Sequence, residues 1–250
     1  MSNTVIGSSR LFFSTLTSTN RFATQLLSKT RPRAGTVISA EFQTKGEGQY
    51  GRSWFGSKGK NLYVSVILYP QLPAGEQFRL SAFSALAVRE TVESLGGGNA
   101  KIKWPNDVYV GDSKVAGILI KNTISGQSIQ NTIIGIGINL NEEVFPEELP
   151  NPSSINHITG NEQSLQAARE SLIDNLNEFY RSSLESDFSV ICHAYEKHLY
   201  MVGQNARFEL TSDSSLIGGV IEGVDEFGRL RLKHDNYQHV YTLNEIRFVK

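Results

Sequence analysis

Residues 101–121 read KIKWPNDVYVGDSKVAGILIK and carry the clearest structural pattern in the chain. Two short runs, 101–104 and 108–110, have strand character and flank a Pro-Asn-Asp sequence that favours a turn. The run 114–121 is apolar between its terminal lysines, which is typical of a buried strand. Strands joined by a short turn lie side by side in a sheet, so polar side chains of this stretch can converge at one end of it.

Lys103, Asp107 and Lys114 are the polar residues that make this stretch a candidate site. A surface hairpin with solvated lysines is the ordinary alternative, and it suffices for a lysine taken at random. Lys114 differs because it opens an otherwise apolar strand, where a cation needs a partner or a ligand. The pattern therefore indicates a binding role for Lys114 in particular.

The segments on both sides of this stretch show helix and strand patterns. Ser18-Thr19-Asn20 has the short polar side chains of a helix N-cap and precedes the helical pattern RFATQLLSK. Further helices are predicted at 76–95, 164–185 and 188–200. Further strands are predicted at 36–42, 61–69 and 132–141, the last paired with 114–121 through a turn near Gly126.

The end of the chain has a different character. From about Gly203, short runs with strand character are separated by Gly, Asp and Asn, which predicts a small β-barrel of roughly 45 residues. We therefore expect an α+β domain at 1–202, with a mixed sheet flanked by helices, and a second domain at 203–250. The polar segment 142–163 is long for a connection, and such loops are often functional or mobile.

Residues 46–51, GEGQYG, match the dinucleotide-binding pattern G-x-G-x-x-G. That pattern needs a helix after the third glycine to hold a pyrophosphate, whereas here another glycine and then a strand follow. Two interpretations stay open: an ordinary flexible hairpin loop, or a loop whose bare backbone approaches a ligand. In the second, Arg52 could bind a phosphate and Trp54 could offer a flat apolar face.

Residues 135–141, GIGINLN, alternate glycine with isoleucine in an expected strand. One face of that strand is therefore bare. Strand glycines often mark the approach of a ligand or of another backbone, but simple packing explains this segment equally well.

The overall composition excludes several classes of protein. A formal net charge of −1 gives no electrostatic footprint for nucleic acid or an anionic membrane. Cys192 is the only cysteine, so no disulfide can form within the chain, and the five histidines form no metal-binding pattern with it. The sequence starts without a secretory signal pattern, and its apolar runs are strand-sized. We therefore expect a cytoplasmic protein that binds neither DNA nor a membrane.

These segments, in this order, resemble the biotin–protein ligase family. The matching segments are Ser18-Thr19-Asn20; Gln43 with Gly46-x-Gly48-x-x-Gly51-Arg52-x-Trp54; Lys103-Trp104-Pro105-Asn106-Asp107; Lys114-x-x-Gly117-Ile118; Gly135-Ile136-Gly137-Ile138-Asn139; and Ser153-Ser154-Ile155 with Thr159-Gly160. The Lys-Trp-Pro-Asn-Asp string with a lysine seven residues after it is specific, whereas the glycine loop alone is not. The resemblance covers about residues 10–250 and implies a class II synthetase-like catalytic domain followed by an SH3-like barrel.

The resemblance implies an enzyme that uses ATP and Mg²⁺ to form biotinyl-5′-AMP. The biotin then passes to a lysine of a biotin carboxyl carrier protein, or of the carrier domain of a biotin-dependent carboxylase. The implied catalytic residues are Lys114, Arg52 and Asp107, since an anion that attacks an anion needs fixed positive charge. The implied biotin-binding residues are Ser18, Thr19, Asn20, Gln43, Gly46, Glu47, Gly48, Gln49, Lys114 and Gly117. The implied nucleotide-binding residues are Arg52, Trp54, Lys103, Asn139 and Ser154, and the metal ligands are left open.

The sequence departs from the family pattern in the glycine loop. That loop is often Gly-Arg-Gly-Arg-Arg-Gly in the family, but here Glu47, Gln49 and Tyr50 take the arginine places. Backbone contacts to the ligand would persist, whereas charge contacts would not. The sequence also starts about 17 residues before Ser18, which leads us to expect a monofunctional type without an N-terminal DNA-binding domain. A homodimer through an exposed sheet edge is allowed.

Two other functions compete with this interpretation. A lipoate or octanoate ligase or transferase would need an apolar slot, whereas Ser18, Thr19 and Gln43 suit a ureido ring, which must be hydrogen-bonded once buried. A non-catalytic biotin sensor is disfavoured by the neutral charge and the missing DNA-binding segment. We also expect loops 46–54 and 151–161 to order over the adenylate, with Ile155 and Ile158 of the second loop able to cover an adenine ring.

Overall fold

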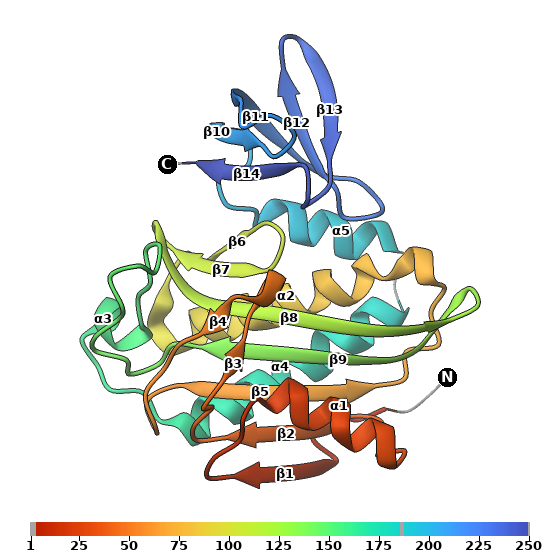
Figure 1. Cartoon of the computed structure of the whole chain (residues 1–250), viewed down its shortest axis with the longest axis vertical. Helices are drawn as coiled ribbons and strands as arrows, with labels where there is room; N and C mark the ends of the chain where they lie inside the picture. Colours follow the sequence, from red (N-terminus) through yellow and green to blue (C-terminus); the bar gives the residue numbers. More distant parts are fainter. Residues whose placement is uncertain (1–3, 186–187, 250) are drawn as a thin grey trace.

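A computed structural model describes residues 4–185 and 188–249. The central sheet contains β1 (Ser9–Phe13), β2 (Thr36–Ala40), β5 (Leu62–Leu68), β6 (Lys101–Lys103), β7 (Asp107–Val110), β8 (Ser113–Ser125) and β9 (Ser128–Ile138). Its strand order is β1-β2-β5-β9-β8-β7-β6 (Figure 1). β1 and β2 are parallel, and the other neighbouring strands are antiparallel. The expected mixed sheet is therefore confirmed.

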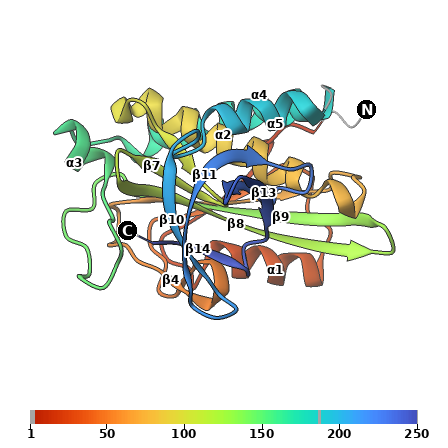
Figure 2. The same cartoon turned by 90° about the horizontal axis from the view of Figure 1, so that it is seen from above.

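Helices cover both faces of this sheet (Figure 2). The helical segments are α1 (Thr19–Lys29), η2 (Ala74–Glu76), α2 (Phe78–Val92), η3 (Glu93–Gly97), α3 (Ile155–Thr159), α4 (Leu165–Glu185) and α5 (Phe188–Lys197). α1 lies against β5 and β9 on one face, and α2 and α4 cover the other. Within the two described ranges, no helix is both long and apolar enough to cross a membrane.

Strand β5 shows why the two faces of the sheet differ. Val64 and Val66 pack into the main core with α2 and α4. Ile67 joins a smaller apolar cluster with Ala23 of α1. Because successive side chains of a strand point to opposite faces, Ser65 lies on the α1 face with Ile67. A polar group is thus placed beneath α1.

A small hairpin lies on the same face as α1. It consists of β3 (Gly46–Glu47) and β4 (Ser53–Trp54), with a 3-10 turn, η1 (Gln49–Gly51), between them. It crosses in front of β8 and β9 (Figure 1). No helix follows the glycines, so the dinucleotide interpretation is excluded, as the strand–loop–strand pattern indicates.

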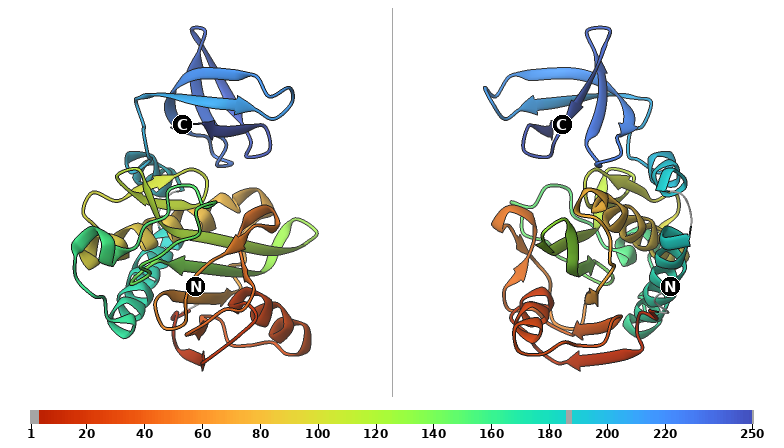
Figure 3. Two further views of the ribbon diagram at one scale, coloured as in Figure 1. Left: turned by 60° about the vertical axis from the view of Figure 1, so that its left-hand side comes forward. Right: turned by 90° about the vertical axis from the view of Figure 1, so that its right-hand side faces the viewer.

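The C-terminal segment forms a separate antiparallel sheet at one end of the molecule (Figure 3). Its strands are β10 (Asn205–Leu210), β11 (Leu216–Val224), β12 (Leu230–His234), β13 (Tyr237–Tyr241) and β14 (Ile246–Val249). Their order is β13-β12-β11-β10-β14, so the expected small β unit is present. Its closure into a barrel stays a prediction, as does the domain boundary at residue 202.

The connection after β9 is more structured than its polar composition indicates. Within the expected long loop 142–163, Ser154 caps α3 by accepting a hydrogen bond from the backbone of His157 (3.2 Å). The sequence carries the signal for this cap, a serine before a short apolar-containing run. Because the run is only five residues long, its helical period was too short to recognise.

Candidate active site

Three glycines form the floor of the candidate site, on the α1 face of the sheet. Gly117 of β8 pairs with Gly137 of β9, and Gly135 follows on the same face of β9. Without side chains, these positions leave the sheet backbone open to whatever covers it. α1 and the β3–β4 hairpin lie above this floor (Figure 1).

Trp54 of the hairpin lies directly on two of these glycines. A Cβ atom at Gly137 would stand 2.5 Å from the indole ring, and one at Gly117 would stand 2.6 Å from it. Alanine at either position would therefore displace the ring. In the described part of the chain, the buried Trp54 Nε1 finds no hydrogen-bond acceptor. The indole N–H is thus free to donate to a ligand.

A polar network lies at the N-terminus of α1. Gln43 Oε1 accepts hydrogen bonds from the backbone N and the Oγ1 of Thr19, at 2.7 and 3.1 Å. The Ser65 hydroxyl lies 2.8 Å from Thr19 Oγ1 and 2.7 Å from Asn20 Oδ1, and it can donate to either. Asn20 Nδ2 donates to the carbonyl of Leu119 on β8 at 3.1 Å. The network therefore joins α1 to the sheet.

Two features of this network suit a polar ligand. Because the Gln43 side-chain oxygen is the acceptor in both bonds, the Gln43 amide nitrogen keeps its two donors. Asn20 also fills the space above Gly135, where a Cβ atom would overlap its carboxamide. Thr19, Asn20 and Gln43 thus lie together in this structure, and their contacts with biotin stay a prediction.

Ser65 is the member of this network that the sequence reasoning missed. It is fully buried and is the single serine within the otherwise large apolar and aromatic run LYVSVIL of β5. A polar residue in a strand that is otherwise buried needs a hydrogen-bond partner, and that was the available signal. Its partners come from α1, a different element, so the pattern alone could not reveal them.

Lys114 and Asp107 form an ion pair at the other side of the floor. Lys114 Nζ lies 2.7 Å from Asp107 Oδ1, and both side chains are more than two-thirds buried. The ammonium also lies 5.4 Å from the centroid of the Trp54 ring. Asp107 pairs in register with Gly117, so the ion pair stands beside the glycine floor. The expected convergence of these two side chains is therefore present.

The loop after β9 is fixed to the start of β8. Lys114 N donates to Asn151 O at 2.7 Å, and Ser153 N donates to Lys114 O at 2.9 Å. The buried Asn139 side chain donates to Ser153 O at 3.0 Å. Asn139 thus holds the loop beside Lys114 in this structure, and its contact with a nucleotide stays a prediction.

One expectation about this loop is wrong. Ile155 was expected to be able to cover an adenine ring, but it is fully buried in the main core. Its backbone N–H donates to Asn139 O at 3.0 Å, which fixes it there. Ile158, with 36% of its surface exposed, remains available to cover a ligand. Ser154 is also buried and caps α3, so its hydroxyl does not face an open site.

Several other predicted site residues lie outside this cluster. Ser18 caps α1 through the backbone N–H of Arg21 (3.3 Å). Gln49 lies in the 3-10 turn of the hairpin. Arg52 directly follows that turn and is exposed. Within the residues that the structure describes, the Arg52 guanidinium has no ion-pair partner.

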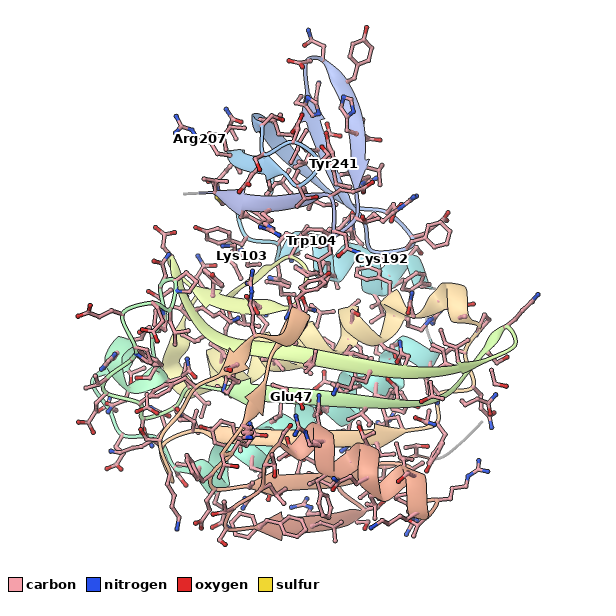
Figure 4. All side chains as sticks on the ribbon, in the orientation of Figure 1. Glu47, Lys103, Trp104, Cys192, Arg207 and Tyr241 are labelled. Atoms are coloured by element: carbon pink, nitrogen blue, oxygen red, sulfur yellow. The ribbon has the colours of Figure 1, made fainter. Side chains whose placement is uncertain are left out.

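Lys103 points away from the floor, toward the C-terminal sheet (Figure 4). Its ammonium lies 4.7 Å from the ring centroid of Tyr109 and 4.9 Å from that of Phe248 in β14. Such contacts between a cation and aromatic faces are stabilising. In this structure Lys103 therefore contacts the C-terminal sheet, while it pairs in register with Asp107 beside the floor. Its role in nucleotide binding stays a prediction.

The hairpin is fixed at two places. At its base, the buried Glu142 carboxylate accepts hydrogen bonds from Ser57 N, Ser57 Oγ and Asn61 Nδ2 at 2.6, 2.8 and 2.7 Å. On β3, the Glu47 carboxylate contacts two cations from other elements. Gly48 N donates to Arg52 O within the hairpin, so this N–H is not available to a ligand.

The arrangement can bind an elongated molecule with two different ends. The Thr19–Gln43 network offers neutral hydrogen-bonding groups for a polar ring. Lys114 offers fixed positive charge for an anionic group, and Trp54 offers an apolar face beside it. Positive charge held in a partly buried site stabilises charge that develops on a reacting oxygen or phosphate.

The sequence of this chain is similar to that of known proteins. The family model described as the biotin/lipoate A/B protein ligase family matches residues 12–139. The bifunctional ligase/repressor BirA of Bacillus subtilis is 28% identical over 242 residues, which cover 95% of this chain and 74% of that protein. A biotin–acetyl-CoA-carboxylase ligase of Paracoccus denitrificans is 29% identical, with 84% of this chain and 89% of that protein covered.

The fold is similar to that of solved structures. A biotin protein ligase from Aquifex aeolicus, in complex with biotin and ATP, superposes with a TM-score of 0.80 over 97% of this chain and 99% of that chain. Its sequence identity is 24%. A Leishmania major biotin protein ligase in complex with biotin has a TM-score of 0.65 over 94% of this chain and 98% of that chain, at 22% identity.

Proposed function

Since the chain belongs to the biotin/lipoate A/B protein ligase family, we propose that it is a biotin–protein ligase. It forms biotinyl-5′-AMP from biotin and ATP and transfers biotin to a lysine of a carrier protein. The observation that carries the proposal is a single face of one sheet. On that face, a neutral polar network and a lysine–aspartate ion pair stand on either side of a glycine floor.

The polar network favours biotin over lipoate. Biotin's ureido ring has one carbonyl acceptor and two N–H donors, whereas the dithiolane ring of lipoate has none of these groups. The Gln43 amide supplies donors, and the hydroxyls of Thr19 and Ser65 supply both donors and acceptors. An apolar ring would leave the Gln43 amide donors unpaired, at a cost of about 1–3 kcal/mol. The network therefore favours a polar ring.

The lone thiol does not suit acyl transfer through cysteine. Cys192 lies on α5, away from the glycine floor (Figure 4). Burial raises the pKa of this thiol to about 11, and the carboxylate of Glu196 adds to the effect. The reactive thiolate would be scarce at neutral pH. An octanoate transferase that uses a cysteine nucleophile is therefore disfavoured.

The first step joins two anions. A carboxylate oxygen of biotin attacks the α-phosphorus of ATP, the bond from that phosphorus to the bridging oxygen breaks, and pyrophosphate leaves. Lys114 would hold the carboxylate against the phosphate and offset the negative charge that accumulates there. Asp107 would orient the Lys114 ammonium through their ion pair. Arg52, which is exposed on the hairpin, would reach the phosphates only when the ligand is present.

The second step releases AMP. The neutral amine of a carrier lysine attacks the acyl carbonyl of biotinyl-AMP, the bond to the phosphate oxygen breaks, and the amine loses a proton. Biotin then stands in amide linkage on the carrier. The carrier is a biotin carboxyl carrier protein or the carrier domain of a biotin-dependent carboxylase, in line with the relatives that are named for acetyl-CoA carboxylase.

Magnesium fits the site as a companion of ATP. Among the described residues, no three His, Cys, Asp or Glu side chains gather as a metal site. Mg²⁺ does not need such a cluster, because it commonly uses one or two carboxylates together with substrate phosphates and water. Asp107 is the carboxylate beside the floor and would be that ligand. The ion would supply further positive charge to the phosphates.

We extend the proposal to partners and location. Because the formal net charge is −1, we do not expect the chain to bind DNA sequence-specifically. We expect the enzyme to be cytoplasmic. β1 and β6 are the outer strands of the central sheet, but Ile102 of β6 is already hydrogen-bonded to the backbone of His198 and Tyr200. A homodimer through β1 is therefore the arrangement that is compatible with the fold. Residues 1–202 would form the catalytic domain and 203–250 the small β domain.

Transfer to a carrier tests the proposal. The protein, ATP, Mg²⁺ and biotin are incubated with a purified biotin carboxyl carrier domain, and the carrier is measured by intact mass spectrometry. We expect the mass of one biotinyl group on one lysine, and no addition to a carrier in which that lysine is replaced by arginine. An unmodified carrier, under conditions where a known ligase modifies it, would contradict the proposal.

A further inference from the structure

The Glu47 carboxylate of β3 is shared between two cations from different elements. Arg21 of α1 donates to Glu47 Oε1 from Nε and Nη2, at 3.0 and 2.6 Å. Lys121 of β8 lies 2.8 Å from Glu47 Oε2. We call these three residues the Glu47 bridge. Figure 4 labels Glu47 at the front of the sheet, above α1.

We propose that Glu47 is a positioning residue that closes the β3–β4 hairpin over the glycine floor and thereby retains the acyl-adenylate. The proposal rests on the proposed function for the identity of the retained molecule. It concerns the side chain of Glu47, the acidic residue of the two-residue strand β3. Negative charge at this position turns the hairpin toward Arg21 and Lys121, two cations that an arginine would repel.

The hairpin depends on such contacts because it is small. β3 and β4 pair over two residue pairs, and the hairpin is not a strand of the central sheet. Isolated two-stranded hairpins are marginally stable in water. Its base is fixed separately by Glu142 and Ser57, so the Glu47 bridge controls the β3 side. Trp54, on the paired strand, then seats on Gly117 and Gly137.

The strength of the bridge is moderate. The side chains of Arg21 and Lys121 are 49% and 44% exposed, so solvent and salt screen each pair. The two-point contact from Arg21 and the shared carboxylate make the set stronger than one exposed pair. A bridge of this strength permits the hairpin to open for biotin and ATP and to close afterwards.

The charge of Glu47 persists at neutral pH. Burial acts to raise the pKa of this carboxyl, but hydrogen bonds and charge from Lys121 and Arg21 outweigh it, and the pKa falls below its usual 4.5. Because the pKa of the Glu47 carboxyl is lowered in the folded protein, its ion pairs contribute their full stability at pH values above the usual pKa. That stability is lost as the pH falls through the lowered pKa. At neutral pH the Glu47 bridge is therefore best weakened by raising the ionic strength rather than by changing the pH.

The first experiment needs no ligand. Hydrogen exchange of residues 46–54 is measured in the ligand-free wild type and in Glu47→Gln, which keeps the size of the side chain and removes its charge. We expect the variant to exchange about fivefold faster in this segment. Glu170→Gln is the matched control, because it breaks an exposed arginine–glutamate pair with Arg10 on other elements. Equal exchange in the wild type and Glu47→Gln would overturn the proposal.

The second experiment measures retention. The protein is loaded with labelled biotinyl-AMP, an excess of unlabelled biotinyl-AMP is added, and release is followed. We expect about fivefold faster release from Glu47→Gln and a smaller increase from Lys121→Gln, which leaves the Arg21 pair in place. The double variant should be no faster than Glu47→Gln, because that change already removes the pair with Lys121. Raising the salt from about 0.05 to 0.5 M should speed release from the wild type by a larger factor than from Glu47→Gln, in which only the contacts with the anionic ligand remain to be screened.

The outcomes separate this proposal from the proposed function. Additive effects of the two substitutions, or the same salt dependence in wild type and Glu47→Gln, would show that the bridge does not control release. If the wild type does not bind biotinyl-AMP at all, the proposed function fails. The hydrogen-exchange comparison still tests the bridge in that case, because it uses the protein without ligand.

Discussion

Ser65 illustrates how one hydroxyl can determine the chemistry of a pocket. It is buried beneath α1 and lies within hydrogen-bond distance of both Thr19 and Asn20. Because the hydroxyl carries one hydrogen, removing it would leave one of these two partner oxygens short of a donor. Such a loss costs about 1–3 kcal/mol when the groups are buried.

Ser65→Ala, Gln43→Ala and Thr19→Val should therefore weaken biotin binding more than ATP binding. We expect each to raise the dissociation constant for biotin roughly 5- to 150-fold, in line with about 1–3 kcal/mol. Titration calorimetry with each ligand is the measurement. Ser8→Ala, an exposed position outside the site, serves as the control. Unchanged biotin affinity in all three variants would remove this network from the pocket.

Lys114 is the residue on which the chemistry depends most. Lys114→Ala should lower the rate of biotinyl-AMP formation by about 100- to 1000-fold, because the fixed charge beside the phosphate is lost. The fold should persist, since the side chain is partly exposed and forms an ion pair rather than core packing. Lys29→Ala, at the exposed end of α1, is the control. A normal rate in a folded Lys114→Ala protein would show that the catalytic assignment is wrong.

At this scale, the residues that the sequence could identify are those whose partners are close in sequence. Lys114 and Asp107 are joined by one turn, so their convergence followed from strand pairing. Ser65 meets Thr19 only because α1 packs on β5, a contact across 46 positions. The exposure of Arg52 likewise depends on how the hairpin folds back, which no local pattern encodes.

The hairpin and the glycine floor act together at the scale of elements. Gly137→Ala would place a Cβ atom 2.5 Å from the Trp54 ring and displace it. We expect slower adenylation and faster exchange of residues 46–54. Gly75→Ala is the matched control, since its Cβ would meet nothing within 4 Å. In a Trp54→Ala background, adding Gly137→Ala should cause little further loss; fully additive losses would show that the ring does not seat on this glycine.

Ordering of the two loops by the ligand remains a prediction, but the expected change is now larger for loop 46–54 than for loop 151–161. Hydrogen exchange with and without biotin plus ATP should show strong new protection over 46–54. Over 151–161 the change should be smaller at the start, because Ser153 and Ile155 are already hydrogen-bonded to Lys114 and Asn139. Equal protection of 46–54 in both samples would mean that the ligand adds no order to the hairpin beyond what the Glu47 bridge provides.

The long helices and strands could be predicted from the periodic spacing of their apolar residues, whereas the short ones could not. The strands β5, β8 and β9 and the helices α2 and α4 have apolar patterns long enough to recognise. The hairpin strands β3 and β4 are two residues each, and α3 is five. Such elements are stabilised by contacts that come from elsewhere, such as the Glu142 carboxylate at Ser57. These contacts are absent from the local sequence.

Across the whole molecule, the Lys-Trp-Pro-Asn-Asp string connects the site to the C-terminal sheet. Trp104 Nε1 donates to Gly228 O in the turn between β11 and β12, at 2.8 Å. Asp107, three residues later, pairs with Lys114 in the site. The same short string thus contacts the small β unit with one end and supplies the active site with the other. The resemblance indicated that the string matters, but the structure was needed to separate these two tasks.

The central claim is that this face of the sheet activates biotin, and pyrophosphate release tests it most directly. The purified protein is supplied with ATP and Mg²⁺, and pyrophosphate is followed with biotin, with lipoate or with neither. We predict release that depends on biotin and is nearly absent with lipoate. Release that depends on lipoate, or no release with biotin, would contradict the account.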